Sequence, residues 1–184
     1  MNFILSQCFG LVALILVCIS YLLGSKKNFL AFQIIANLFY ALSFLTLDVM
    51  VGGVNTIISI ARVTVLYFFE KSDKEPPIWL FVIFSMLYLL SGNCFYQNDL
   101  DILAVVAYEF FNMAMFIRDI ELTRIMMIFP NLLIVIYNFL NFTFTNSILD
   151  LVEIIVLLVV TIRCALQKRR SQVKYLIWFE IIEP

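Results

Sequence analysis

Apolar residues fill most of the chain in seven long runs, which short polar stretches or proline residues separate. The runs are Leu5–Leu23, Asn28–Leu47, Val49–Phe69, Pro77–Leu90, Leu100–Ile117, Leu122–Phe144 and Ser147–Leu166. A helix needs about 20 mostly apolar residues to cross the hydrocarbon core of a bilayer, and most of the runs approach that length. The pattern therefore predicts an all-α integral membrane protein with seven transmembrane helices.

The third run carries polar residues on one side. Asn55, Ser59 and Arg62 follow at spacings of four and three residues, which places them on one face of a helix. An arginine in the middle of a lipid-exposed helix costs at least about 2.5–3.5 kcal/mol. We therefore expect this face to contact protein or water.

The first three runs repeat later in the chain. When the sequence is shifted by 94 residues, they fall on the last three runs without a gap, and Asn37 falls on Asn131. The fourth run is left over between the two sets. We therefore predict two parallel three-helix repeats joined by a linker helix, a 3+1+3 plan known from transporters that bind a substrate between the repeats.

The predicted units have simple boundaries. Residues 1–72 form the first repeat, 73–98 the linker helix with its flanking loops, and 99–167 the second repeat. Between Trp79 and Leu90 the linker carries only Ser85 as a strongly polar residue, which favours a lipid-facing helix. Residues 168–184 are basic and then rich in aromatic residues, which is typical of a tail lying at the cytoplasmic membrane interface.

Composition narrows the class of protein. Of the 184 residues, 64% are hydrophobic and 14% are charged, which leaves no room for a soluble domain of useful size. Histidine is absent, so imidazole general-base catalysis and histidine-ligated metals are excluded. The sequence also has no phosphate-binding glycine loop and no nucleic-acid-binding patch. We expect no cofactor and no metal, and an intramembrane enzyme is the least supported function.

The basic residues indicate an orientation. The connections after the first, third and fifth runs and the tail contain Lys26, Lys27, Lys71, Lys74, Arg118, Arg124, Lys168, Arg169, Arg170 and Lys174. The other connections, around Asp48 and at residues 93–101 and 142–146, contain no lysine or arginine. Because positive residues remain on the cytoplasmic side, the pattern predicts an N-terminus outside and a C-terminus in the cytoplasm.

Polar groups from both repeats fall near mid-depth. We expect a solute to contact six of them: Asn37, Asn55, Arg62, Glu109, Asn112 and Asn131. Arg62 and Glu109 belong to different repeats and are expected to form an ion pair across the interface, or else Glu109 carries a proton. Asparagines in membrane helices also form hydrogen bonds to neighbouring helices. For Asn37 and Asn131, helix packing and contact with a solute are therefore equally good explanations of a polar residue at mid-depth.

A second set of polar residues marks a pathway. We assign Gln33, Ser59, Asn138 and Glu153 to a route or to support of the site, with Asn141 continuing the polar stripe along the sixth run. Asp150 lies one turn before Glu153, where negative charge at a helix N-terminus is a sufficient structural explanation.

Four stretches resemble a known family. LSQCFGLVAL at Leu5–Leu14, VNTIISIAR at Val54–Arg62, IYNF at Ile136–Phe139 and LDLVEIIVLLVVTIR at Leu149–Arg163 are similar to YgjV-type bacterial inner-membrane proteins. That family is distantly similar to the SWEET, PQ-loop (MtN3-like) and PnuC-like transporters. The resemblance implies a bacterial inner-membrane location and a facilitator for a small polar solute.

The likeness to SWEET transporters has limits. Their pockets use an asparagine from the third helix of each repeat. Asn55 matches in the first repeat, but the second offers Leu149-Asp150. The Pro-Gln pair of PQ-loop proteins is also absent, because Gln33 follows Phe32. These departures speak against carrying sugar specificity over.

Two function classes stay open. The leading hypothesis is a transporter of a small polar solute, either a SWEET-like facilitator or a proton-coupled carrier. The alternative is a non-transporting membrane interaction or scaffold protein, in which the polar residues fasten helices and the basic tail recruits a partner. The expected partners are the lipid bilayer and the solute, with no nucleic acid, and self-association into a homo-oligomer is left open.

Overall fold

The computed structural model is all-helical and describes residues 2–46, 50–96, 99–140 and 144–182. Within these residues it has seven helices: α1 (Asn2–Leu22), α2 (Lys26–Thr46), α3 (Met50–Lys71), α4 (Ile78–Cys94), α5 (Asp101–Phe116), α6 (Ile120–Leu140) and α7 (Phe144–Ile182). Each helix coincides with one of the seven apolar runs, so the all-α prediction is confirmed.

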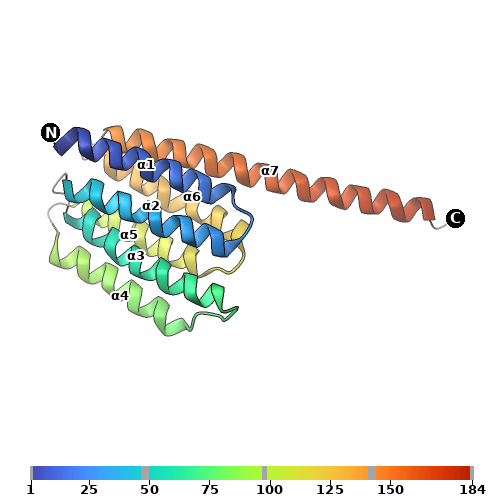
Figure 1. Cartoon of the computed structure of the whole chain (residues 1–184), viewed down its shortest axis with the longest axis horizontal. Helices are drawn as coiled ribbons and strands as arrows, with labels where there is room; N and C mark the ends of the chain where they lie inside the picture. The colour runs from blue at the N-terminus through green and yellow to red at the C-terminus, as the bar shows by residue number, and fades with distance from the viewer. Residues whose placement is uncertain (1, 47–49, 97–98, 141–143, 183–184) are drawn as a thin grey trace.

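Six of the helices form a closed ring. Around it, α1 contacts α2, α2 contacts α3, α3 contacts α5, α5 contacts α6, α6 contacts α7, and α7 returns to α1. Helix α4 lies outside this ring against α3 and α5 (Figure 1). Successive helices run in opposite directions, so α1 and α5 point the same way. The internal symmetry of the two halves stays a prediction.

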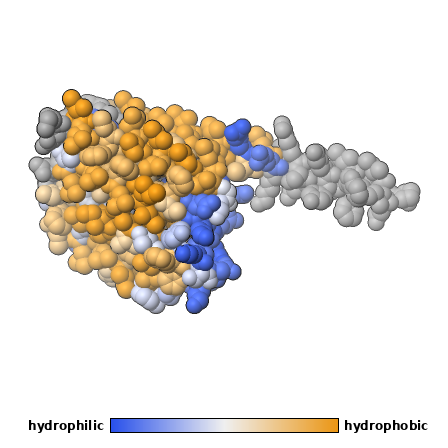
Figure 2. All heavy atoms as spheres, viewed as in Figure 1, coloured by the Kyte–Doolittle hydropathy of each residue, from blue (hydrophilic) through white to orange (hydrophobic). Residues whose placement is uncertain are grey.

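The outside of the bundle is apolar. Large hydrophobic side chains are exposed along every helix, including Leu11, Leu38, Ile57, Trp79 and Ile155. Figure 2 shows apolar residues over most of the visible face, with hydrophilic residues gathered at one end. Serine, asparagine and arginine side chains are instead buried inside. This is the distribution that lipid, rather than water, selects.

Among the described residues, four helices are long and apolar enough to cross a membrane by length and composition. These are α1 from Ile4 onward, α2, α3 and α6. Helix α4 is apolar but shorter, with 17 residues, and α5 has 16. At about 1.5 Å per residue, α4 and α5 reach roughly 24–26 Å, slightly less than a typical hydrocarbon core.

The last helix is longer than the sequence pattern predicts. We expected it to end near Leu166, but α7 continues without a break to Ile182. Figure 1 shows this extension passing beyond the end of the bundle. Position 168 is therefore no boundary between helix and tail, and an interfacial position for the extension stays a prediction.

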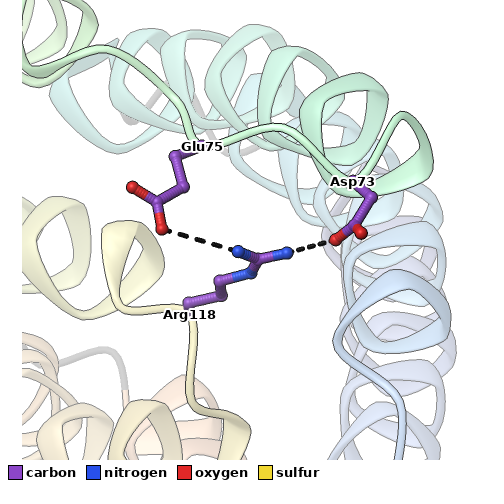
Figure 3. Close-up of polar contacts among 3 residues, drawn as sticks. All are labelled: Asp73, Glu75 and Arg118. Atoms are coloured by element: carbon purple, nitrogen blue, oxygen red, sulfur yellow. Dashed lines mark hydrogen bonds and ion pairs between the residues drawn. The ribbon is translucent and has the colours of Figure 1, made fainter.

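One end of the bundle, called the basic end here, carries the connections at residues 23–25, 72–77 and 117–119. There Arg118 forms ion pairs with Asp73 and with Glu75, the latter at 3.5 Å (Figure 3). These three side chains are largely exposed, so the ion pairs add little to stability.

Buried polar contacts also join the two halves at the basic end. Nζ of Lys26 donates to Oγ1 of Thr123 at 2.8 Å, and Nη2 of Arg124 donates to the Leu23 carbonyl at 2.6 Å. These contacts connect the turn between α1 and α2 to the start of α6. They are shielded from water, so they hold the halves together more firmly than the exposed ion pairs do.

Helix α4 is more than a lipid-facing linker. Its outer side is exposed, as expected, with Trp79 57% accessible. Its inner side is buried through Leu80, Phe84 and Tyr88, which pack against α3 and α5. At Gly92 the helix approaches α5 so closely that an added Cβ would lie 2.5 Å from Cγ2 of Val105.

We predict that Gly92→Ala destabilises the protein by about 1–3 kcal/mol, because the new methyl group overlaps the β-branched Val105 side chain. Thermal unfolding of the purified protein in one detergent measures the effect. Gly24→Ala is the control, since no atom lies within 4 Å of a Cβ there. The double variant Gly92→Ala, Val105→Ala is expected to recover part of the loss. Equal melting temperatures for Gly92→Ala and wild type would contradict the close approach of α4.

Candidate functional site: a polar cavity inside the helix ring

The six ring helices enclose a cavity. About 100 Å³ of it is open to the centres of water-sized spheres, which is room for several water molecules. Every ring helix contributes to its wall, and α4 does not. Its polar lining residues are Tyr21, Gln33, Asn37, Tyr40, Thr56, Ser59, Arg62, Tyr108, Asn131, Tyr137, Asn138, Asp150 and Glu153.

The ring order separates these groups by charge. In a ring of six, each helix faces the third helix along, so α3 lies opposite α7 and α2 lies opposite α6. Helix α3 brings Arg62, whereas α7 brings Asp150 and Glu153. The amides come from the other pair, with Gln33 on α2 and Asn131 on α6. The cavity thus has a cationic wall, an opposite acidic wall, and amide-bearing walls between them.

Arg62 is a buried cation without a counter-ion. Its side chain is 2% exposed, and its Nε and Nη1 atoms have no hydrogen-bond partner among the described residues. Its guanidinium lies 5.5 Å from the centre of the Tyr88 ring, a favourable cation–π distance. The Tyr88 hydroxyl is in turn 2.8 Å from Oγ of Ser59. Arg62 therefore lies between the Tyr88 ring of α4 and the cavity.

The acidic wall is held by hydrogen bonds. The Tyr40 hydroxyl donates to Oε1 of Glu153, and the Tyr21 hydroxyl donates to Oε2 at 3.4 Å. Nδ2 of Asn138 donates to Oδ2 of Asp150 at 2.6 Å. Because α1, α2 and α6 supply these donors, three neighbouring helices fix the two carboxyl groups in position.

The amide groups on the wall differ in whether their nitrogen atoms have hydrogen-bond partners. Nε2 of Gln33 donates to Oγ of Ser20 at 2.9 Å, and Nδ2 of Asn37 donates to the Gln33 carbonyl at 2.8 Å. Nδ2 of Asn131 is buried and lies within reach of the Tyr21 hydroxyl, but it makes no hydrogen bond of good geometry with a described residue. Pro130 precedes it inside α6, where proline removes a backbone donor. The amide nitrogen of Asn131 is therefore less fully bonded than those of Gln33 and Asn37.

Seven of the ten residues proposed from sequence lie on the wall: Gln33, Asn37, Ser59, Arg62, Asn131, Asn138 and Glu153. Asn141 lies outside the described residues. The sequence reading missed the tyrosines that line the cavity, of which Tyr40 and Tyr21 hold Glu153. In an apolar run a tyrosine looks like any other large hydrophobic residue. The one signal of a cavity position would have been that a buried hydroxyl group needs a hydrogen-bond partner.

The other three proposed residues do not line the cavity. Asn55 accepts a hydrogen bond from Ser91, and Asn112 donates to Ser85 at 2.9 Å and to the Phe81 carbonyl at 3.2 Å. All these partners belong to α4. The two asparagines therefore fasten α4 to α3 and α5.

The expected ion pair between Arg62 and Glu109 is not formed. Neither residue makes an ion pair with any described residue, and Oε1 of Glu109 is buried without a hydrogen-bond partner. Arg62 instead lies over the Tyr88 ring, and Glu109, which is not on the cavity wall, acts on both of these residues from a distance. The alternative, a protonated Glu109, stays a prediction.

Comparison with known proteins identifies the family. The chain belongs to the Imp-YgjV family of bacterial inner membrane proteins, whose family model matches residues 4–168. No curated protein and no solved structure gives a significant match to the chain. The family resemblance and the inner-membrane location expected from the sequence are therefore confirmed, whereas a relationship to SWEET or PQ-loop transporters is not shown.

We predict unequal stability effects for two buried asparagines. Asn112→Ala removes two hydrogen bonds to α4 and is expected to destabilise the protein by about 0.6–1.7 kcal/mol. Asn131→Ala removes an amide whose nitrogen makes no hydrogen bond of good geometry with a described residue, so it is expected to cost less than about 0.6 kcal/mol. Thermal unfolding of both variants in the same detergent makes the comparison. A loss for Asn131→Ala as large as that for Asn112→Ala would show that Asn131 is fully bonded within the bundle.

Proposed function

We propose that this inner membrane protein is a carrier that moves a small polar solute through the cavity. The observation that supports the proposal is Arg62, a buried and unpaired cation on the wall of a polar cavity inside an otherwise apolar bundle. Ionisable residues within membranes are rare and face pathways or binding sites. Arg124, which is also buried, donates to the Leu23 carbonyl, whereas Arg62 makes no hydrogen bond with a described residue, so fastening of helices does not account for Arg62.

We further propose seven membrane spans with the basic end in the cytoplasm. The Lys and Arg residues of the connections gather at that end, in agreement with the positive-inside rule. The N-terminus then lies outside. Helix α7 projects from the cytoplasmic side.

In this orientation the cavity is closed toward the cytoplasm. An apolar cluster that includes Phe29, Leu30, Leu66, Ala114 and Leu157 fills the ring on the side of the basic end. Val17, Tyr21, Met115 and Met127 belong both to this cluster and to the cavity wall, so they form its floor. The buried contacts of Lys26 and Arg124 join the halves beyond that floor.

Two seams in the ring would permit opening. The half formed by α1–α3 meets the half formed by α5–α7 where α1 contacts α7 and where α3 contacts α5. Rocking of the halves about these seams would separate the floor and break the contacts of Lys26 and Arg124. This is the alternating-access scheme of carriers built from three-helix units, such as the SWEET proteins. Proton coupling would use Glu153, the carboxyl group on the wall that two tyrosines hold.

A cysteine placed on the wall tests this proposal. In a variant whose four native cysteines are replaced by serine, Asn131→Cys is expected to react with a membrane-impermeant thiol reagent from either side of the membrane. A carrier exposes its site alternately, so both right-side-out and inverted vesicles should be labelled. Asn112→Cys is the matched control, since that position packs against α4 and should stay unlabelled. Labelling of Asn131→Cys from one side only, or from neither, argues against a carrier.

The second candidate is a membrane interaction protein. It is favoured by one observation, the continuation of α7 as a helix beyond the bundle. A projecting basic helix is a suitable docking element for a partner.

Deletion of the chain after Gln167 separates the two functions. The carrier proposal predicts that the shortened protein keeps the two-sided labelling of Asn131→Cys, because every lining residue lies before this point. A docking protein should instead lose its partner while its bundle stays folded. Loss of the labelling in a shortened protein with an unchanged melting temperature would favour a functional role for the extension.

A further inference from the structure

We propose that the solute of the cavity is a small zwitterion, with an anionic group bound at Arg62 and a cationic group at the acidic wall of Asp150 and Glu153. This inference rests on the proposed carrier function and specifies its substrate class. Its basis is that groups of opposite charge lie on opposite helices of the ring, α3 and α7, with the cavity between them.

The anionic end follows from the unused donors of Arg62. Nε and Nη1 lie on different edges of the guanidinium, and each is an N–H donor that can form a charge-assisted hydrogen bond to an anionic oxygen. Both atoms are buried without a hydrogen-bond partner among the described residues, and Glu109 acts on Arg62 from a distance without forming an ion pair with it. Folding has thus removed water from a cation without bringing an anion into contact with it. A carboxylate in the solute would complete the pair.

The cationic end follows from the acidic wall. Each oxygen of Glu153 accepts one hydrogen bond from a tyrosine hydroxyl, and Oδ2 of Asp150 accepts one from Asn138. A carboxylate oxygen has two acceptor sites, so these bonds leave acceptor capacity for an ammonium group. The hydroxyls and the amide meanwhile hold both carboxyl groups in fixed positions.

Charge complementarity favours a zwitterion over the simpler classes of solute. A solute with only an anionic group would satisfy Arg62 but would also face two carboxyl groups. A solute with only a cationic group would leave Arg62 unpaired, and a neutral sugar would hydrogen-bond to both walls without balancing the charge of either. A zwitterion satisfies both walls, and the amides of α2 and α6 lie between them. The two other walls, on α1 and α5, include Val17, Ala104 and Phe111 and would receive an apolar side group.

Matched ligands test the charge requirement on the purified full-length protein. Leucine is compared with 4-methylpentanoate, which lacks the amine, and with 3-methylbutylamine, which lacks the carboxylate. Alanine, phenylalanine and glycine betaine extend the range of sizes, and glucose and uridine serve as neutral solutes. We expect at least one zwitterion to raise the melting temperature with a saturable dependence on concentration. Removing either charge should weaken binding about 10–100-fold.

Variants connect each charge to its wall. Arg62→Gln and Glu153→Gln are each expected to weaken binding of the zwitterion about 10–100-fold. Arg62→Lys keeps the charge but loses the planar array of donors, so it should fold and bind with intermediate affinity. Arg118→Gln and Glu75→Gln are the charge-matched controls, because these residues form an exposed ion pair away from the cavity wall, and they should bind as wild type does. Equal losses in the controls would assign the effect to general destabilisation and overturn the inference.

The outcomes separate this inference from the carrier proposal. Binding of 4-methylpentanoate as tightly as leucine, or of glucose in preference to any zwitterion, overturns the zwitterion class. Absence of a shift with all four zwitterions overturns it as well. The two-sided labelling of Asn131→Cys does not depend on the choice of ligand, so the carrier proposal stands or fails on that experiment alone.

Discussion

Enclosure of a guanidinium within an apolar bundle is the constraint on which the rest of the structure depends. Arg62 is almost fully buried in a protein whose outer surface is hydrophobic. Leaving such a group in lipid costs several kcal/mol, so the chain must surround it. The ring of six helices does this on the cavity side. Helix α4 does it from behind, where the face of Tyr88 partly offsets the lost hydration.

The buried polar residues of the bundle differ in whether they form hydrogen bonds between helices. Asn55 and Asn112 have partners on α4, and Ser6 and Ser43 bond each other between α1 and α2 at 2.9 Å. In lipid such bonds replace the hydrophobic effect as a means of fixing which helices meet. Arg62 makes no side-chain hydrogen bond with a described residue and lies on the cavity wall. A role in fastening helices therefore accounts for the two asparagines but not for Arg62.

The sequence predicts the helices well because lipid imposes a simple rule on them. Apolar runs and their breaks locate all seven helices, and Arg62 is correctly expected to face the interior. Helical spacing tells which residues share a face but not which helix that face meets. The α4 partners of Asn55 and Asn112 were therefore missed, since α4 was expected to have no polar role. The extent of α7 was missed because hydropathy detects the membrane segment and not a helix that continues beyond it.

The unpaired donors also explain how a solute could bind tightly to so small a site. Folding has already removed Arg62 from water and fixed Glu153 between two tyrosines, so a ligand would bear little of the cost of ordering these groups. Each ionic contact would then contribute nearly its full strength in the low dielectric of the bundle. The same reasoning requires the empty cavity to be less stable than the occupied one. A polar network completed from within the bundle would be more stable, but it would leave the solute nothing to bind.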